Sequence, residues 1–187
     1  FYPGKNLGAY GEGGAITTND EAIAARVRTL RDHAQSAKYL HEEVGFNYRM
    51  DGVQGAVLGV KLRHLDAWNN ARRQVAARYQ ELLGDTALQL PGEAAGRRSV
   101  WHLYVVRHPQ RDGLQQALTE AGIGSGLHYP IPVHLQPAYA HLGHRPGDFP
   151  VSEQVAQECL SLPIYAELSA DQQSHVAQTV GQILEEL

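Results

Sequence analysis

Apolar residues recur at helical spacing early in the chain, just after a short β-prone run at Ala15–Thr18. Asn19 and Asp20 then offer an N-cap for a helix that we expect to continue to about Asp32. The residues that would share one apolar face of this helix are Ile23, Val27 and Leu30. The pattern therefore predicts a short strand followed by an amphipathic helix.

A second helical pattern begins near Asp51 and contains no proline through Leu83. Asp51 and Gln54 form a D-x-x-Q pair that resembles a capping box. The apolar stripe of this pattern consists of Val53, Val57 and Val60. Because residues 38–50 show no periodicity, we expect them to form an irregular connection in front of one long helix.

Strand-like and helical segments alternate in the remainder of the chain, which favours an α/β class. The pattern predicts strands at residues 100–106 and 123–129, and helices at residues 110–121, 151–159 and 171–187. Residues 84–98 contain proline and several glycines and are interpreted as a loop. Pro130, Pro132 and Pro137 disfavour regular structure after the second strand.

The composition is that of an ordinary globular protein, with 43% hydrophobic and 19% charged residues, which argues against disorder. The net charge is −4 and the basic residues are scattered, so we expect no nucleic acid as a partner. Cys159 is the single cysteine, which excludes an intramolecular disulfide and favours a cytoplasmic location. Its helical spacing from Val155 and Ala156 predicts a packing role in a helix. No apolar run approaches the roughly 18 residues of a membrane helix, so we expect no membrane partner.

The best candidate for a catalytic segment is the string Tyr2-Pro3-Gly4-Lys5-Asn6, which precedes the glycine-rich residues 8–14. Glycines permit positive φ and allow main-chain N–H groups to approach a ligand, while Pro3 stiffens the turn. A lysine that is buried or close to other cations loses its proton easily and can attack an aldehyde such as that of pyridoxal phosphate. Lys5 is therefore the candidate catalytic residue. The alternative is a solvated charge, which is the commoner state of a lone loop lysine.

Residues 1–20, FYPGKNLGAYGEGGAITTND, resemble the lysine segment of the DegT/DnrJ/EryC1/StrS aminotransferases, pyridoxal-phosphate enzymes that aminate sugar nucleotides. Similar segments follow in the family's order at residues 31–58, 99–107, 122–139 and 147–165. The resemblance covers nearly the whole chain and implies the C-terminal half of such an enzyme, with fold-type I architecture. Residues 1–66 would then form the end of the large domain, which binds pyridoxal phosphate. Residues 67–187 would form a linking helix and the small α/β domain.

The resemblance also implies how two residues contact the cofactor. Lys5 would hold pyridoxal 5′-phosphate and move a proton during amino transfer from glutamate to a nucleoside-diphosphate keto sugar. The family's asparagine that matches Asn47 reaches across a homodimer to the phosphate of the other subunit's cofactor, for which an amide N–H₂ is a suitable donor. Without the resemblance, a turn-capping role for Asn47 is an equally good interpretation. Arg49 either adds charge nearby or pairs with Glu42 or Glu43.

Three side chains on a proline-stiffened loop are candidates for substrate binding. His128 and Tyr129 match family positions that contact substrate, and His134 follows on the same loop. Their imidazoles and phenol can form hydrogen bonds with a hydroxylated or phosphorylated substrate. Tyr2, beside Lys5, either lines the same site or packs in a core. Because the two histidines lack a carboxylate or thiolate nearby in the sequence, we expect no metal site.

Several other functions stay open from the sequence. Similar sequences aminate cyclic ketones such as inososes, whereas related dehydratases replace the lysine with histidine, so Lys5 favours amino transfer. Members of the family have also been described as regulators, but the chain shows no DNA-reading helix with a basic face. A third alternative is a catalytically incomplete fragment of the same fold, because the expected phosphate cradle and pyridine partner match residues upstream of Phe1.

Overall fold

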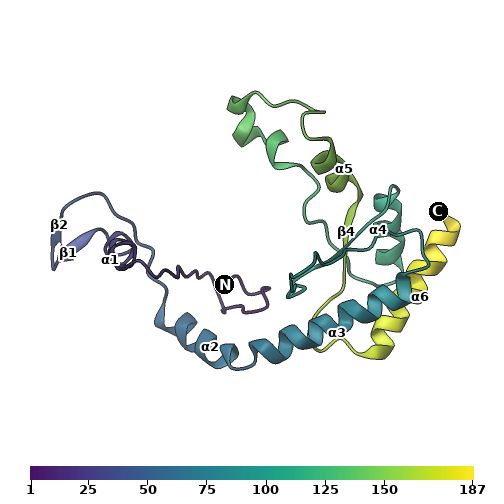
Figure 1. Cartoon of the computed structure of the whole chain (residues 1–187), viewed down its shortest axis with the longest axis horizontal. Helices are drawn as coiled ribbons and strands as arrows, with labels where there is room; N and C mark the ends of the chain where they lie inside the picture. The colour runs from purple at the N-terminus through teal and green to yellow at the C-terminus, as the bar shows by residue number, and fades with distance from the viewer. The chain divides into compact units, whose positions relative to one another are not determined.

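The computed structural model describes all 187 residues and divides into two units, Phe1–Leu65 (unit 1) and Asp66–Leu187 (unit 2). Each unit is described by itself, and Figure 1 labels the elements of both. The division lies one residue before the expected boundary between residues 66 and 67. Every helix is either too short or too polar to span a lipid bilayer.

Unit 1 contains two helices and a small hairpin. They are α1 (Glu21–Leu30), β1 (Gln35–Ala37), β2 (Leu40–His41) and α2 (Gly52–Leu62). The carboxylate of Asp20 accepts the backbone N–H groups of Ala22 at 2.8 Å and Ile23 at 3.1 Å. This contact satisfies two of the amide groups left unpaired at a helix start, which confirms the cap expected at Asp20.

Two expectations for unit 1 were wrong. Ala15–Thr18 forms no strand, because no other segment of this chain pairs with it and a strand needs a partner for its backbone groups. The connection before α2 is more regular than expected, since β1 and β2 pair antiparallel on either side of a turn at Tyr39. Tyr39 has a φ of 69°, a left-handed conformation that hydrophobic periodicity does not report.

The long helix expected from residue 51 to residue 83 is broken. α2 ends at Leu62 and α3 (Leu65–Leu83) begins after a tight turn, in which the N–H of His64 donates to the carbonyl of Lys61 at 3.0 Å. This pairing spans three residues instead of the four of an α-helix. Neither proline nor glycine marks the break, so the sequence pattern missed it.

Unit 2 is built around a two-stranded antiparallel sheet. β3 (Tyr104–Arg107) pairs with β4 (Cys159–Leu162), with Tyr104 opposite Leu162 and Arg107 opposite Cys159. The remaining elements are α4 (Arg111–Glu120), the 3₁₀ turns η1 (Val133–Leu135) and η2 (Pro137–Leu142), α5 (Pro150–Glu158) and α6 (Ala170–Glu186). Strands and helices alternate as the α/β class requires.

The sheet differs in detail from the expected strands. Of the first expected strand, residues 100–106, only Tyr104–Val106 belongs to β3, which continues to Arg107. Residues 123–129 contribute a single bridge between Gly126 and Ser161. Cys159 begins β4 instead of ending a helix, although it is buried as expected, with 1% of its surface exposed. The run of Cys159 to Leu162 is buried on both faces, so it lacks the alternation by which a strand is recognised.

The core lies entirely in unit 2. Side chains with no exposed surface come from α3, β3, α4, β4 and α6: Tyr79, Leu83, Tyr104, Val106, Leu114, Leu118, Leu160 and Val180. Each fully buried apolar side chain stabilises the fold by about 1.5–3 kcal/mol relative to an exposed one. The core therefore holds α3 and α6, from the two ends of unit 2, against the sheet. The sheet in turn fixes both ends of the segment between β3 and β4.

Candidate functional site

The lysine loop, residues 2–14, begins with a tight turn. The N–H of Lys5 donates to the carbonyl of Tyr2 at 2.9 Å, which places Pro3 and Gly4 at the centre of the turn. The side chains of Tyr2 and Lys5 are exposed on this chain. A lysine at such a position can be reached by a ligand.

The glycines of the loop act through close packing, contrary to the expectation that they permit positive φ. None of the glycines between residues 4 and 14 has positive φ. A Cβ on Gly8 would lie 2.2 Å from the carbonyl oxygen of Pro3, and one on Gly13 would lie 3.0 Å from Sδ of Met50. The loop therefore requires glycine because it folds onto itself and onto the start of α2.

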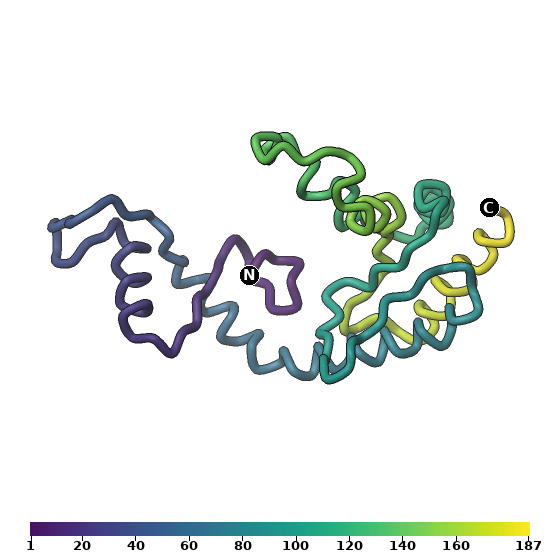
Figure 2. The backbone as a smooth tube through the Cα atoms, turned by 45° about the horizontal axis from the view of Figure 1, so that its top comes forward, coloured from purple at the N-terminus to yellow at the C-terminus, as the bar shows by residue number.

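α2 holds the lysine loop through two polar side chains. Oε1 of Gln54 accepts the N–H of Tyr10 at 2.8 Å, and Nζ of Lys61 donates to the carbonyl of Gly8 at 2.6 Å. Nζ of Lys61 also lies 5.8 Å from the centre of the Tyr10 ring, within the range of a cation–π contact. Figures 1 and 2 show the N-terminal loop beside α2.

The sequence pattern did not predict that Gln54 and Lys61 anchor the loop. Gln54 was assigned to a capping box, but Asp51 makes no side-chain cap contact and the Gln54 amide reaches the loop instead. Gln54, Leu58 and Lys61 share one face of α2, and of the helix residues only Leu58 is fully buried. The signal that could have found them is this spacing of polar residues seven positions apart on one helix face.

Asn47 lies on a segment whose backbone is well fixed. It forms an isolated antiparallel bridge with Asp32, and its neighbour Tyr48 donates its N–H to the carbonyl of Arg31 at 2.9 Å. The side chain of Asn47 is exposed, so its amide is available to a partner. Arg49 forms an ion pair with Asp32, so the alternative in which it pairs with Glu42 or Glu43 was wrong. The other alternative, added charge near the cofactor, stays a prediction.

The two predicted cofactor contacts of unit 1 lie on different segments of the chain. The lysine loop lies beside α2, whereas the β1–β2 hairpin that precedes Asn47 lies at the other end of the unit in both views (Figures 1 and 2). Lys5 and Asn47 are therefore presented as separate exposed groups. The roles assigned to them stay predictions.

In unit 2, the three predicted substrate-binding residues have different surroundings. Nδ1 of His128 lies 2.8 Å from Oγ of Ser161, and the His128 and Tyr129 rings meet edge to face at 5.5 Å. Both residues are exposed. His134 lies on η1 with only 8% of its side chain exposed, and its Nε2 is 3.0 Å from Oε1 of Glu153 on α5.

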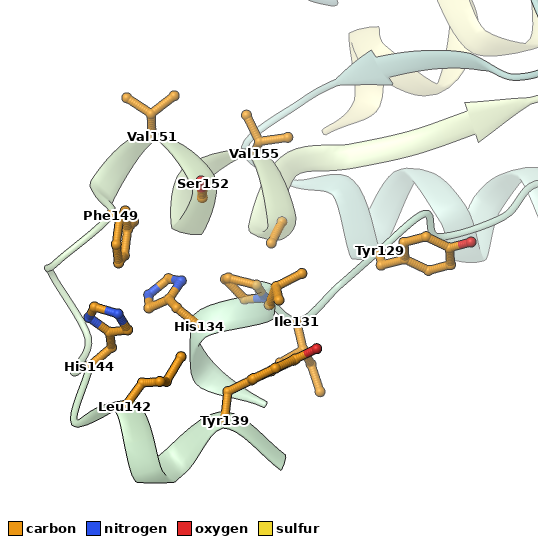
Figure 3. A pocket seen from close by; sticks show the side chains of 13 residues that line it. Tyr129, Ile131, His134, Tyr139, Leu142, His144, Phe149, Val151, Ser152 and Val155 are labelled. Atoms are coloured by element: carbon orange, nitrogen blue, oxygen red, sulfur yellow. The ribbon is translucent and has the colours of Figure 1, made fainter. Parts of the chain in front are cut away.

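Tyr129 and His134 line a common pocket of about 730 Å³ between η1, η2 and α5 (Figure 3). His134 lies in the middle of the view, near His144 and Phe149, and Tyr129 lies on the other side of Ile131. His128 is not part of the lining. The structure thus brings together two of the three predicted residues.

Glu153 connects three segments around this pocket. Its carboxylate accepts the N–H of Gly147 at 2.9 Å and that of Phe149 at 3.3 Å, besides meeting His134. The backbone hydrogen bond from Gly147, followed by those from Phe149 and His134, holds the pKa of Glu153 below its usual range. Glu153 was not singled out in the sequence, where a helix-start carboxylate gives no distinct signal.

No group of three or more histidine, cysteine, aspartate or glutamate side chains is arranged to hold a metal ion. The candidate ligand-binding groups are instead the exposed amine of Lys5, the exposed amide of Asn47, and the imidazoles of His134 and His144 beside an apolar pocket. Such groups can bind an aldehyde, an anion or a planar ring, respectively.

Comparisons of this chain with known proteins agree on one family. The model of the DegT/DnrJ/EryC1/StrS aminotransferase family matches residues 1–181. The erythromycin biosynthesis sensory transduction protein EryC1 of Saccharopolyspora erythraea is 52% identical over 181 residues, covering 96% of this chain and 50% of that protein. The dTDP-3-amino-3,4,6-trideoxy-alpha-D-glucose transaminase of Streptomyces venezuelae is 45% identical, covering 96% of this chain and 48% of the relative.

A solved structure shows the same fold. The crystal structure of S. venezuelae DesV in complex with a ketimine intermediate superposes with a TM-score of 0.95 at 44% identity. The match covers 100% of this chain and 51% of the DesV chain. This chain spans about half the length of the curated relatives that it matches, and the expected α/β fold of a pyridoxal-phosphate-dependent aminotransferase is confirmed.

Proposed function

The chain belongs to the DegT/DnrJ/EryC1/StrS aminotransferase family, and we propose that it contributes the lysine-bearing part of a pyridoxal-phosphate-dependent aminotransferase. The amino acceptor would be a keto sugar attached to a nucleoside diphosphate, and the donor would be glutamate. The observation that carries the proposal is Lys5, exposed on a tight turn whose loop is anchored by Gln54 and Lys61. Relatives named as transaminases of dTDP-sugars support the choice of substrate.

The residues present fit one end of the cofactor. An amine on an exposed turn suits the aldehyde of pyridoxal phosphate, and Lys5 would hold the group there. When bound, the cofactor supplies an electron sink for the carbon that loses a proton. Nζ of Lys5 would take that proton from the substrate carbon and return it to the neighbouring reaction centre, acting first as base and then as acid.

The remaining contacts would come from other residues of this chain and from a second copy of it. The exposed amide of Asn47 would donate to the cofactor phosphate of a second copy, so the active form would be a homodimer with shared sites. His128, Tyr129, His134 and Tyr2 would contact the substrate. The cytoplasmic location expected from the single cysteine is part of the same proposal.

Borohydride reduction in the presence of pyridoxal phosphate tests the assignment. The chain contains three lysines, Lys5, Lys38 and Lys61, so peptide mapping can distinguish all of them. We expect the pyridoxyl label on Lys5 and its loss in Lys5→Ala, with labelling unchanged in Lys38→Ala. The experiment should be run on this chain and on the complete reading frame that encodes it, and label on another lysine in both would refute the proposal.

A regulatory role is the second candidate, because the relative with 52% identity is named a sensory transduction protein. An absorbance scan with added pyridoxal phosphate separates the two roles when it is combined with an amino-transfer assay. A visible band whose intensity falls on addition of glutamate supports amino transfer. A band that glutamate leaves unchanged favours a cofactor-binding regulator.

A further inference from the structure

A second pocket, of about 390 Å³, is formed in unit 2 by α3, α6 and the residues that precede α6. The two helices lie side by side in Figures 1 and 2, and none of the residues assigned to the proposed function lines the pocket. We propose that this pocket binds a free α-amino acid with a small apolar side chain, such as valine. Amino-acid binding there goes beyond the proposed amino transfer and does not depend on it.

Two polar atoms of the lining residues are buried without a hydrogen-bond partner. They are Nε of Arg78, which is a donor, and Oε1 of Gln173, which is an acceptor. Only 6% of Gln173 is exposed. A buried polar atom without a partner is rare in folded proteins and costs free energy, so each one requires an explanation. A ligand that accepts from Arg78 and donates to Gln173 would give both atoms a partner.

Hydrogen bonds within unit 2 hold both side chains in this orientation. Nε2 of Gln173 donates to the carbonyl of Leu168 at 2.8 Å, so an exchange of the two amide atoms would set one oxygen against another. A terminal nitrogen of Arg78 donates to Oγ of Ser174 on α6 at 3.0 Å. The acceptor at Gln173 is therefore fixed by the fold, and the donor belongs to a guanidinium that is already anchored at its other end.

The charges of the lining residues favour a zwitterion. Arg78 is their only cation, and Glu81, which follows it by one turn of α3, is their only anion. The guanidinium suits a carboxylate, whereas Glu81 and Oε1 of Gln173 can both accept from an ammonium group. A phosphate would meet the charge of Glu81 without a second cation to offset it. A simple amine would leave Arg78 without a partner.

The rest of the lining suits a short aliphatic side chain. The apolar residues among it are mostly small: Ala71, Val75, Ala77, Ala166 and Leu168. Val75 and Leu168 are buried, whereas Ala77 and Glu81 are exposed, so the pocket opens to solvent on the side of α3 that carries Ala77 and Glu81. The side chain of glutamate would bring a second carboxylate without a second cation. The amino donor of the proposed reaction is therefore a poor ligand for this pocket.

Valine and two truncated analogues test the assignment on the intact chain. Titration of L-valine into the ¹⁵N-labelled protein should shift the amide signals of Arg78, Leu168 and Gln173. 3-Methylbutanoate lacks only the ammonium group of valine, and 2-methylpropan-1-amine lacks only its carboxylate. Each analogue should bind at least about tenfold more weakly than valine, the scale of one lost hydrogen bond to a charged group. Glutamate and inorganic phosphate should also bind more weakly than valine.

Two variants assign the two ends of the ligand. Arg78→Gln should abolish the preference for valine over 2-methylpropan-1-amine, and Glu81→Gln should reduce the preference for valine over 3-methylbutanoate. Glu185→Gln removes an exposed carboxylate of α6 outside the pocket, so this matched control should leave both preferences unchanged. Because each preference is a ratio measured within one variant, a partial loss of folding cannot imitate the result.

Several results would overturn the proposal. The absence of any valine-dependent shift would leave ordered water as the partner of the two buried atoms. Equal affinities for valine and either truncated analogue would refute the zwitterion, as would glutamate or phosphate binding as tightly as valine. Shifts confined to residues outside the pocket would refute the location. Lys5→Ala lies in unit 1 and should leave valine binding unchanged, so the pyridoxyl label and amino-acid binding can fail independently.

Discussion

Unit 2 buries its apolar side chains, whereas unit 1 leaves most of them exposed. Eight large side chains of unit 2 have no exposed surface at all, but the only buried hydrophobic residues of unit 1 are Ala9, Ala34 and Leu58. On α2, Val53, Val60 and Leu62 are 68%, 60% and 58% exposed. The difference teaches that unit 2 is stabilised by a buried apolar core, whereas unit 1 is held by hydrogen bonds and turns, including the contacts from Gln54 and Lys61 to the lysine loop.

Identical substitutions in the two units should have very different effects. Leu114→Ala empties a fully buried position in α4 and should lower the free energy of unfolding by about 2–5 kcal/mol. Leu62→Ala, on the exposed face of α2, should stay within about 0.5 kcal/mol. Urea unfolding followed by circular dichroism measures both. Similar losses in the two variants would show that the α2 face is covered in solution.

The core of unit 2 also contains a matched pair of tyrosines. The hydroxyl of Tyr79 donates to the carbonyl of Pro163 at 3.0 Å, whereas the buried hydroxyl of Tyr104 has no partner. Burial raises the pKa of both phenols, so neither ionises near neutral pH. Tyr79→Phe should cost about 1–2 kcal/mol, while Tyr104→Phe should be neutral or slightly stabilising. A larger loss at Tyr104 in the same urea experiment would reveal a bound water or a rearranged hydroxyl.

The smallest expected effect comes from removing one helix cap in each unit. Ser169 and Gln172 form a reciprocal capping box at the start of α6, so Ser169→Ala should lower the global stability of unit 2 by about 1 kcal/mol. Asp20→Ala removes the equivalent cap from α1, a helix with no buried residue. It should speed amide exchange in α1 by about fivefold without moving the unfolding midpoint of unit 2. If the midpoint moved, the two units would unfold together.

The sequence predicted correctly those elements whose structure depends on residues close together in the chain, such as α1 and α6. Asp20 caps α1 because its carboxylate reaches amides two and three residues on, and α6 follows an apolar period that its own sequence contains. The family resemblance rests on contiguous strings and needs no knowledge of the fold; the role that it implies for Lys5 stays a prediction. Such features depend on residues close together in the chain.

Features that depend on distant residues were missed. Gln54 could have capped its own helix, but an amide 44 residues away offers it a better partner in the lysine loop. The apolar stripe expected at Val53, Val57 and Val60 is largely exposed, because Gln54 and Lys61 turn a different side of α2 toward the loop. β4 begins at Cys159 since β3 supplies a pairing partner, and periodicity alone carries no record of that partner.

The burial of Cys159 has a practical consequence for spectroscopy. It is the sole thiol of the chain and only 1% of it is exposed, so maleimide reagents should leave it unreacted in the native state. A cysteine introduced at a solvent-facing position would then be the single site of attachment for a fluorophore or spin label. Two such positions, one in each unit, would allow the separation between the units to be measured directly in solution.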